Sequence, residues 1–263
     1  MDPNNSHTIQ QQNPDRVTLI QLTDTHIFSN SDETFDGVNT EQTLKQVIAS
    51  AQTDNWPPDA VLVTGDLVHD PIPVSYQRLG SILECLDCPT FCIPGNHDEP
   101  DIMKQHLPVN QIMIKQVIHF KHWVVILLDS WLPGTHAGEL KQKELELVKY
   151  LLDEHPDKYV LIALHHPPIS IGSPWMDKMG LQNPGALFSI IDRNEMVKGI
   201  IWGHIHQEFN SERAGVRLMA APSTCIQFMP TATNYTRDNQ APGYRKLELF
   251  SDGQLESRVT RII

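Results

Sequence analysis

The chain has 263 residues, with 20 Lys and Arg against 32 Asp and Glu, which gives a formal net charge of −12. This acidic balance argues against a nucleic-acid-binding protein, which usually has a basic face, and it also disfavours an anionic substrate. Hydrophobic residues make up 40% of the chain, enough for a sizeable core, and no apolar run approaches the roughly 18 residues of a membrane span.

The N-terminal 16 residues are polar, rich in Asn and Gln, and lack the apolar segment of a signal peptide. We expect residues 1–16 to form a disordered arm and residues 17–263 to form a single domain. Cys85 and Cys88 make one Cys-x-x-Cys pair with no second pair to complete a zinc site. We therefore expect the four cysteines to be small apolar residues of a reduced, cytoplasmic protein, with half a zinc site or a redox pair as the alternatives.

Short β-rich apolar runs alternate with helical patterns along the chain. The runs are too short for buried helices, and Pro, Gly or Asp residues flank them. They predict strands over residues 17–22, 60–64, 90–93, 123–129, 159–164 and 198–202. Two stretches place their apolar residues on one face at helical spacing, and they predict helices over residues 40–52 and 139–152.

The C-terminal part changes character. Residues 208–213 and 216–220 flank Ala214-Gly215 and predict a hairpin, and residues 243–250 and 255–260 predict a second one. Residues 230–242 have the composition of a polar loop. Strand–helix alternation followed by hairpins indicates an α/β or α+β fold, with either one mixed sheet or two stacked sheets covered by helices.

Polar residues of the same few types follow five of the predicted strands. Because strand ends converge at one edge of an α/β sheet, we expect these residues to lie together. Singly, each group has a structural interpretation such as a turn or a helix cap. In chain order, the groups are Asp24-Thr25-His26, Gly65-Asp66, Gly95-Asn96-His97-Asp98, His165-His166 and Gly203-His204-Ile205-His206.

Imidazole and carboxylate donors together suit Fe, Mn or Zn better than Ca or Mg, which prefer oxygen ligands. The donors are too many for one tetrahedral ion, but two ions about 3.5–4 Å apart that share a carboxylate would use them all. We expect Gly65, Gly95 and Gly203 to permit the tight turns that carry the donors into the site.

The ordered set from Leu22 to His206 resembles the calcineurin-like metallophosphoesterase superfamily. Segments 37–40, 222–228 and 242–245 extend the resemblance to the class III 3′,5′-cyclic-nucleotide phosphodiesterases, specifically the bacterial cyclic-AMP enzymes. The resemblance implies a two-sheet β-sandwich flanked by helices.

The resemblance also implies roles for individual residues. One metal would be held by Asp24, His26, Asp66 and His206. The other would be held by Asp66, Asn96, His165 and His204, with Asp66 bridging the two. His97 matches the catalytic residue, which is not a ligand, and it would protonate the leaving oxygen. The phosphate would contact His26, Asp66, Asn96, His97 and His206.

The expected reaction is hydrolysis of 3′,5′-cyclic AMP to 5′-AMP, which would lower intracellular cyclic AMP. The resemblance points to two Fe²⁺ ions, with Mn²⁺ as the replacement. A glycerophosphodiesterase or a broad phosphodiesterase on the same fold is the alternative, and a non-catalytic metal-binding scaffold is the rival from another class. We expect no nucleic-acid partner and no membrane association, and the sequence leaves the oligomeric state open.

Other residues near the site have two interpretations each. Segment 223–228 either lines a nucleobase pocket, with Phe228 stacking and Gln227 hydrogen bonding, or is a buried strand and loop. Asp98 either orients His97 or caps a helix. His166 is expected to be structural or to support the ligands, and His136 is ambiguous.

Overall fold

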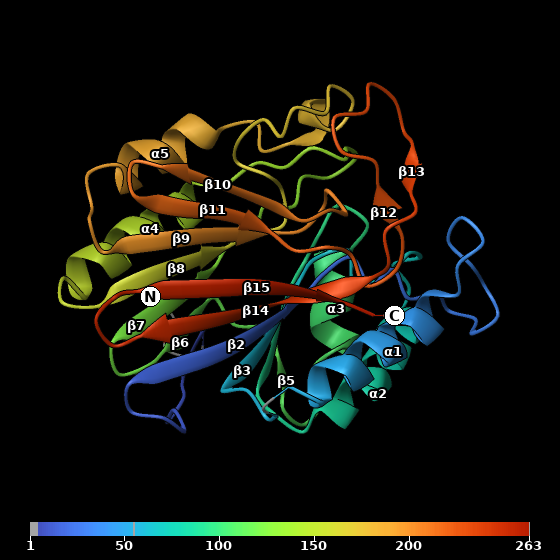
Figure 1. Cartoon of the computed structure of the whole chain (residues 1–263), viewed down its shortest axis with the longest axis horizontal. Coiled ribbons are helices and arrows are strands. Elements are labelled where there is room, and N and C mark those ends of the chain that lie inside the picture. The colour runs from blue at the N-terminus through green and yellow to red at the C-terminus, as the bar shows by residue number, and fades with distance from the viewer. Residues whose placement is uncertain (1–4, 55, 263) are drawn as a thin grey trace.

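The computed structural model describes residues 5–54 and 56–262, and in it two β-sheets pack face to face between layers of helices (Figure 1). One sheet has seven strands in the order β1-β6-β7-β8-β9-β11-β10. These strands are β1 (Ser6–Thr8), β6 (Val117–His119), β7 (Trp123–Leu127), β8 (Tyr159–Ala163), β9 (Val197–Trp202), β11 (Val216–Ala220) and β10 (Phe209–Arg213).

The second sheet has six strands in the order β15-β14-β2-β3-β4-β5. These are β15 (Leu255–Arg261), β14 (Gly243–Phe250), β2 (Arg16–Leu22), β3 (Ala60–Thr64), β4 (Thr90–Ile93) and β5 (Ile112–Met113). Strands β2 to β5 run parallel, and the hairpin β14–β15 adds to β2 in the antiparallel direction. The short strands β12 (Gln227–Phe228) and β13 (Arg237–Asp238) pair with each other beside the sandwich.

Three apolar clusters hold these layers together. One cluster lies between the sheets and takes side chains from both, such as Leu19 of β2 and Val125 of β7. The second packs α4 (Gln142–Glu154) and α5 (Pro184–Ile191) on the seven-stranded sheet. The third packs α1 (Thr40–Gln52), α2 (Pro73–Leu83) and α3 (Pro100–His106) on the six-stranded sheet. The expected two-sheet β-sandwich flanked by helices is therefore confirmed.

Buried polar side chains also join the sheets. Arg245 of β14 is 1% exposed, and its Nη2 atom donates to the carbonyl oxygens of Phe209 and Ala220 at 3.2 and 2.8 Å. Gln21 of β2 donates through Nε2 to the carbonyl oxygen of Trp202 at 3.0 Å. Because a buried donor without a partner is costly, these bonds favour one alignment of the two sheets.

The N-terminal segment differs from the expected disordered arm. Residues 1–4 lie outside the described part of the chain, but Ser6–Thr8 form β1, which pairs in parallel with Val117–His119. The segment is polar because β1 is an edge strand whose stability comes from backbone pairing with β6 rather than from buried side chains.

The helix predicted over residues 139–152 begins later, at Gln142. The side chain of Asn183 explains the difference, because it accepts from the Leu140 amide at 3.0 Å and donates to the Leu140 carbonyl at 2.8 Å. Both backbone groups of Leu140 are therefore held outside the helix. Helix α1, in contrast, covers the predicted residues 40–52, and Asn39 caps it by accepting from the Gln42 amide.

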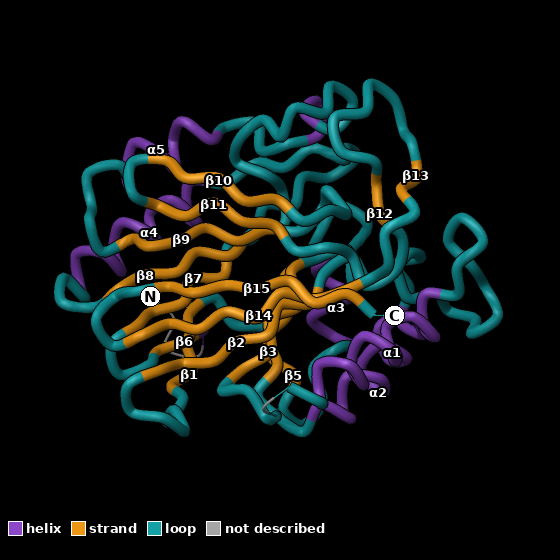
Figure 2. The backbone as a smooth tube through the Cα atoms, in the orientation of Figure 1, coloured by secondary structure: helices purple, strands orange, loops and turns teal. Residues whose placement is uncertain are grey.

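Long loops gather at the end of the sandwich where β12 and β13 lie, as Figure 2 shows. Among the residues that the structure describes, no helix has the length and apolar character needed to cross a membrane.

Candidate metal centre and active site

The polar groups that follow five strands meet at one end of the sandwich. β2, β3 and β4 belong to the six-stranded sheet, whereas β8 and β9 belong to the seven-stranded sheet, so the site lies where the ends of both sheets come together. We expected the site at the edge of one sheet, and the structure instead places it between the ends of two sheets. All seven predicted metal ligands lie in it: Asp24, His26, Asp66, Asn96, His165, His204 and His206.

The predicted first ligand set is compact and buried. The metal-binding atoms of Asp24, His26, Asp66 and His206 all lie within 4.8 Å of one another. Nε2 of His206 is 3.2 Å from Nε2 of His26 and 3.3 Å from Oδ1 of Asp24. Two ligands about 2.1 Å from one ion lie roughly 3.0–3.4 Å apart at tetrahedral or octahedral angles. The spacing of these donors therefore fits a metal ion between them.

The donor atoms of the predicted second set lie around Nε2 of His165. This atom is 3.2 Å from Oδ1 of Asn96, 3.2 Å from Nδ1 of His204 and 3.4 Å from Oδ1 of Asp66. The other carboxylate oxygen of Asp66, Oδ2, faces Nε2 of His26 in the first set at 3.7 Å. Asp66 thus directs one oxygen to each set, which is the arrangement that a bridging carboxylate needs.

Backbone carbonyls orient two of the imidazoles. Nδ1 of His165 donates to the Thr64 carbonyl at 2.9 Å, and Nδ1 of His206 donates to the Ile226 carbonyl at 2.9 Å. Because Nδ1 is used in these bonds, Nε2 is the ring nitrogen of both residues that faces the site.

Asn96 is oriented by a residue whose role the sequence left ambiguous. Nδ2 of Asn96 lies 3.1 Å from Nδ1 of His136, and the amide donates across this contact. Its Oδ1 atom therefore points to His165, as a ligand oxygen should. His136 lies in a loop, and no residue spacing connects it with Asn96 in the sequence.

The backbone is strained at the ligand positions. The φ angles of Asp24, His26, Asp66, His204 and His206 are 54°, 45°, 49°, 66° and 47°, in the left-handed region that residues with a side chain rarely adopt. Such strain costs of order 1–3 kcal/mol per residue and concentrates at functional sites. The fold therefore holds these five side chains in place at a cost in stability.

Glycine is required for different reasons at the three positions next to the predicted ligands. Gly65 has a φ angle of +92°, which confirms the expected tight turn. Gly95 and Gly203 have no positive φ; each instead lies against a neighbour. A Cβ atom on Gly95 would overlap Asp66, and one on Gly203 would overlap Thr23 and lie 2.8 Å from Oδ2 of Asp24. Close approach, rather than turn geometry, requires glycine at these two positions.

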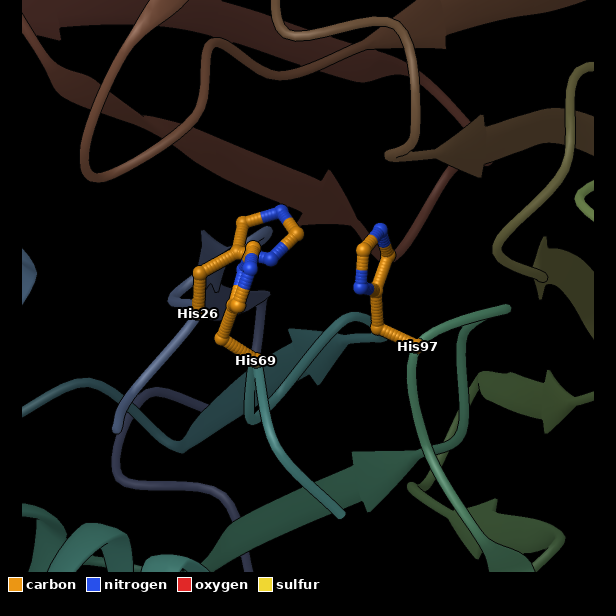
Figure 3. A group of neighbouring side chains, drawn as sticks. All are labelled: His26, His69 and His97. Carbon is orange, nitrogen blue, oxygen red and sulfur yellow. The ribbon is translucent and has the colours of Figure 1, made fainter. Parts of the chain in front are cut away.

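His97 stands beside the ligand sets. Its amide donates to Oδ1 of Asp66 at 2.8 Å, and its half-buried ring stacks on His69 with 5.2 Å between centroids. In Figure 3, the rings of His26, His69 and His97 come from neighbouring loops and point to the same side. These three rings also lie within metal-binding distance of one another, but His26 already belongs to the first set. His97 therefore lies beside the first set and borders the cavity next to it.

Asp98 has neither of its two expected roles. Its carboxylate accepts from the amides of Leu67 and Gly95 at 3.0 and 2.8 Å and from the Tyr76 hydroxyl at 3.2 Å. No side-chain bond caps α3, which begins after Glu99. Burial and the neighbouring Asp66 carboxylate raise the pKa of Asp98 to about 7. Asp98 therefore ties the loop after β3 to the loop after β4.

His166 lies within metal-binding distance of His165 and His204, so its structural and its supporting role both stay predictions. Its Nδ1 atom lies 2.8 Å from the Ser130 hydroxyl, and its ring packs against Gly138.

None of the clusters of metal-binding side chains in the described part of the chain includes a cysteine, so the half zinc site at Cys85 and Cys88 finds no support.

The pKa values of the buried side chains in the centre depend on their charged neighbours. Burial disfavours the charged form of His165, but the Asp66 carboxylate outweighs burial and raises the His165 pKa to about 9. Burial alone would raise the pKa of Asp66, but the neighbouring His165 imidazole holds it well below its usual range. Burial, reinforced by nearby imidazoles, holds the pKa of His26 and His204 well below the usual value. His26 and His204 are therefore neutral donors for a divalent cation, whereas His165 must release its proton before it can bind one.

A cavity of about 210 Å³ opens onto the centre. Of the segment expected to line a base pocket, Phe228 borders this cavity. Ser223 and Gln227 instead support the backbone, since Ser223 donates to the Asp24 carbonyl and Gln227 donates to the Ser223 carbonyl, each at 2.9 Å. Other residues also line the cavity. His136, which the sequence left ambiguous, is one of them, and the sequence missed the rest: Phe35, Trp175, Met176, Met179 and Tyr235.

Comparison with known proteins places this site in context. Residues 17–208 match the family model described as calcineurin-like phosphoesterase. The chain is 38% identical over 246 residues to the 3′,5′-cyclic adenosine monophosphate phosphodiesterase CpdA of Pseudomonas aeruginosa, covering 94% of this chain and 90% of that protein. It is also 38% identical over 261 residues to the protein of the same name from Haemophilus influenzae, covering 98% and 94%.

Solved structures are similar in fold. A dimetal phosphatase from Danio rerio superposes with a TM-score of 0.62 and 14% identity, covering 94% of this chain and 99% of that one. At this identity, the likeness concerns the fold alone.

Proposed function

The chain belongs to the calcineurin-like phosphoesterase family, and from this premise we propose that it hydrolyses 3′,5′-cyclic AMP to 5′-AMP. The observation that carries the proposal is the pair of facing ligand sets that share Asp66. Two relatives that are 38% identical over nearly the whole chain are named cyclic AMP phosphodiesterases, and they indicate the substrate.

Two divalent ions would be held by the two ligand sets. The first set is Asp24, His26, Asp66 and His206, and the second is Asp66, Asn96, His165 and His204. Bound there, they would supply positive charge to the phosphoryl oxygens and make water a better nucleophile. We propose Fe²⁺, with Mn²⁺ as a replacement, because the resemblance to the bacterial cyclic-AMP enzymes points to iron, while the donors themselves suit Fe, Mn and Zn. Elemental analysis of protein purified without added metal tests this choice.

His97 is proposed to supply the proton that the reaction needs. The oxygen of a water molecule forms a bond to phosphorus, the bond from phosphorus to O3′ breaks, and the His97 imidazolium protonates O3′. One proton of the water stays on the phosphate, and the other is released to solvent, from which His97 is protonated again. The hydrogen bond from the His97 backbone amide to Asp66 keeps the imidazole next to the phosphoryl position. The product is a 5′-monophosphate.

The residues proposed to contact the phosphate support this scheme, because all five border the same cavity: His26, Asp66, Asn96, His97 and His206. The cavity is open to solvent on one side and lined by ligands on the other, so a small phosphodiester can reach the centre. The free cysteines among the described residues are in keeping with a location in the reducing cytoplasm, which we also propose and which cell fractionation tests.

Hydrolysis assays at matched metal loading test the proposed function. We expect turnover of cyclic AMP to exceed that of cyclic GMP, glycerophosphodiesters and a chromogenic diester. Faster turnover of a glycerophosphodiester would instead support the alternative enzyme. If the protein bound two ions and hydrolysed none of these esters, it would be a metal-binding scaffold.

A further inference from the structure

Four aromatic side chains form a cage beside the metal centre. Phe35, Trp175, Phe228 and Tyr235 all border the 210 Å³ cavity, although they come from three distant parts of the chain. Trp175 packs edge to face on Phe228 and Tyr235, with centroids 5.3 and 5.8 Å apart, and Phe228 lies 5.4 Å from Tyr235. We call these four residues the aromatic cage.

The aromatic cage is continuous with the metal ligands. Phe228 stacks on His206 with 4.1 Å between centroids and 7° between planes, while His206 points its Nε2 atom at Asp24. Phe35 lies edge to face on His26 at 4.9 Å. A molecule whose phosphate lies at the metal ligands would therefore place an attached ring against the aromatic cage.

One polar group in the aromatic cage lacks a partner. Nε1 of Trp175 is buried and makes no hydrogen bond within the described residues. An unpaired buried N–H group costs free energy, so hydrogen bonding within the described residues does not explain where the Trp175 indole lies. The flat faces of the aromatic cage suit a planar, uncharged ring, and the thioethers of Met176 and Met179, which also border the cavity, suit the same kind of ring.

A role in packing alone does not explain the aromatic cage. Tyr235 is 49% exposed, whereas a core residue would be covered. Its hydroxyl donates to Oδ2 of Asp36 at 2.9 Å, and Nη1 of Arg237 donates to the Asp36 carbonyl at 2.6 Å. These bonds hold loop 230–242 against the loop that carries Phe35. The two loops thus present Tyr235 to the cavity mouth instead of burying it.

We propose that the aromatic cage binds the purine base of the cyclic nucleotide through contacts between the base and the aromatic rings. This inference rests on the proposed function, since it takes the phosphate to lie at the metal ligands. It assigns base recognition to Trp175 and Tyr235, and it leaves Ser223 and Gln227 as supports of the backbone.

Equilibrium binding to the metal-loaded protein tests the aromatic cage. We would titrate 5′-AMP and inorganic phosphate into the wild type and into the variants Trp175→Ala and Tyr235→Ala, using calorimetry. Stacking on an aromatic side chain contributes enough that we expect each variant to weaken AMP binding about tenfold. Binding of inorganic phosphate should stay unchanged. Trp175→Phe, which keeps a ring and loses the N–H group, should weaken AMP binding less than Trp175→Ala does.

Tyr150→Ala is the matched control, because Tyr150 is 46% exposed on α4 and does not border the cavity. It should bind both ligands like the wild type. Folded variants with wild-type affinity for AMP would overturn the inference, and so would an equal loss of AMP and phosphate binding. Cyclic AMP turnover by the wild type is measured separately. Its absence would remove the proposed function, while the AMP and phosphate titrations would still decide whether the aromatic cage binds a base.

Discussion

His97 lies against Asp66 without joining either ligand set, and this position leads to the first prediction. We expect His97→Ala to lower kcat for cyclic AMP by about 10²–10⁴-fold, the usual contribution of a positioned general acid. His97 bonds to Asp66 through its backbone amide, which the alanine variant retains, so the variant should keep both ions. Steady-state kinetics together with elemental analysis measure the two effects. Wild-type turnover in a variant that retains its metals would show that His97 is not the acid.

The contact between His136 and Asn96 leads to a second prediction. Without His136 the Asn96 amide loses the partner that orients its Oδ1 atom, so His136→Ala should weaken binding of the second ion. Changes to residues that support a ligand typically cost 10–100-fold in affinity, and we expect about tenfold. Competition with a chelator measures the affinity. His122→Ala is the control, since His122 lies outside the cavity, and an equal loss in both variants would contradict the role of His136.

At the residue scale, the sequence could predict which side chains gather but not how each is held. Asp, Asn and His after five strands predicted the side chains that gather at the site, since few other patterns combine these types. The bond from Asn96 to His136 depends on how a distant loop folds back. The same holds for Trp175 and Tyr235, which are isolated aromatic residues in loops without periodicity. No local pattern points to either residue.

At the scale of elements, the predictions succeeded where a strand is a continuous apolar run. β3 and β4 occupy the predicted residues 60–64 and 90–93, and both hairpins lie where their turn residues placed them. The strands β1, β5 and β6 and the helices α3 and α5 were missed and are short, whereas the missed helix α2 has 11 residues. Such elements depend on neighbours: β1 forms because β6 offers backbone groups, and α3 packs on α2.

The junction of β9 with its ligand loop yields a third prediction. A methyl group on Gly203 would overlap Thr23 and press on Asp24, so Gly203→Ala must move the loop that carries His204 and His206. We expect a loss of about 1–3 kcal/mol in the free energy of unfolding, together with weaker metal binding. Denaturant unfolding and metal analysis measure both.

Gly185→Ala provides the contrast for this prediction. Gly185 lies in α5 with no atom within 4 Å of an added Cβ, and alanine in a helix is more stable than glycine by roughly 0.5–1 kcal/mol. The two substitutions should therefore change stability in opposite directions. A Gly203→Ala protein as stable as the wild type, with full metal content, would show that the loop tolerates the shift.

At the scale of the whole molecule, strand alternation predicted helices around sheets but not which strands share a sheet. The hairpin β14–β15 pairs with β2, from the other end of the chain, while the hairpin β10–β11 pairs with β9, its neighbour in sequence. Turn residues determine where each hairpin forms. Packing across the sandwich determines which strand the hairpin pairs with. Here the buried bonds of Arg245 join the two hairpins.

The net charge of −12 is also a property of the whole molecule, and it misleads about the substrate. Of the seven predicted ligands, Asp24 and Asp66 are the carboxylates, and the others would bind the ions as neutral donors. Two divalent ions would outweigh these two negative charges, so an anionic diester would meet a positive centre inside an acidic protein. A residue count omits the ions and therefore excludes a substrate that the site suits.

The metal centre should also stabilise the sandwich, and its removal gives the last prediction. Four ligands follow strands of the six-stranded sheet, and three follow strands of the other, so the ions would join the two sheets. Ligand binding to the folded state alone contributes about 2.7 kcal/mol per site at 100 times Kd. At about 2–4 °C per kcal/mol, a chelator should lower Tm by roughly 10–20 °C.

Differential scanning calorimetry of loaded and chelated protein measures this shift. Asp66→Asn is the matched variant, because it removes the charge that both sets share while keeping the shape of the side chain. Its loaded and chelated forms should melt at nearly the same temperature, since neither would hold the ions tightly. Equal Tm values for wild-type protein with and without two bound ions would mean that the ions do not brace the sheets, and the strained φ angles of five ligands would then be stabilised by the protein contacts alone.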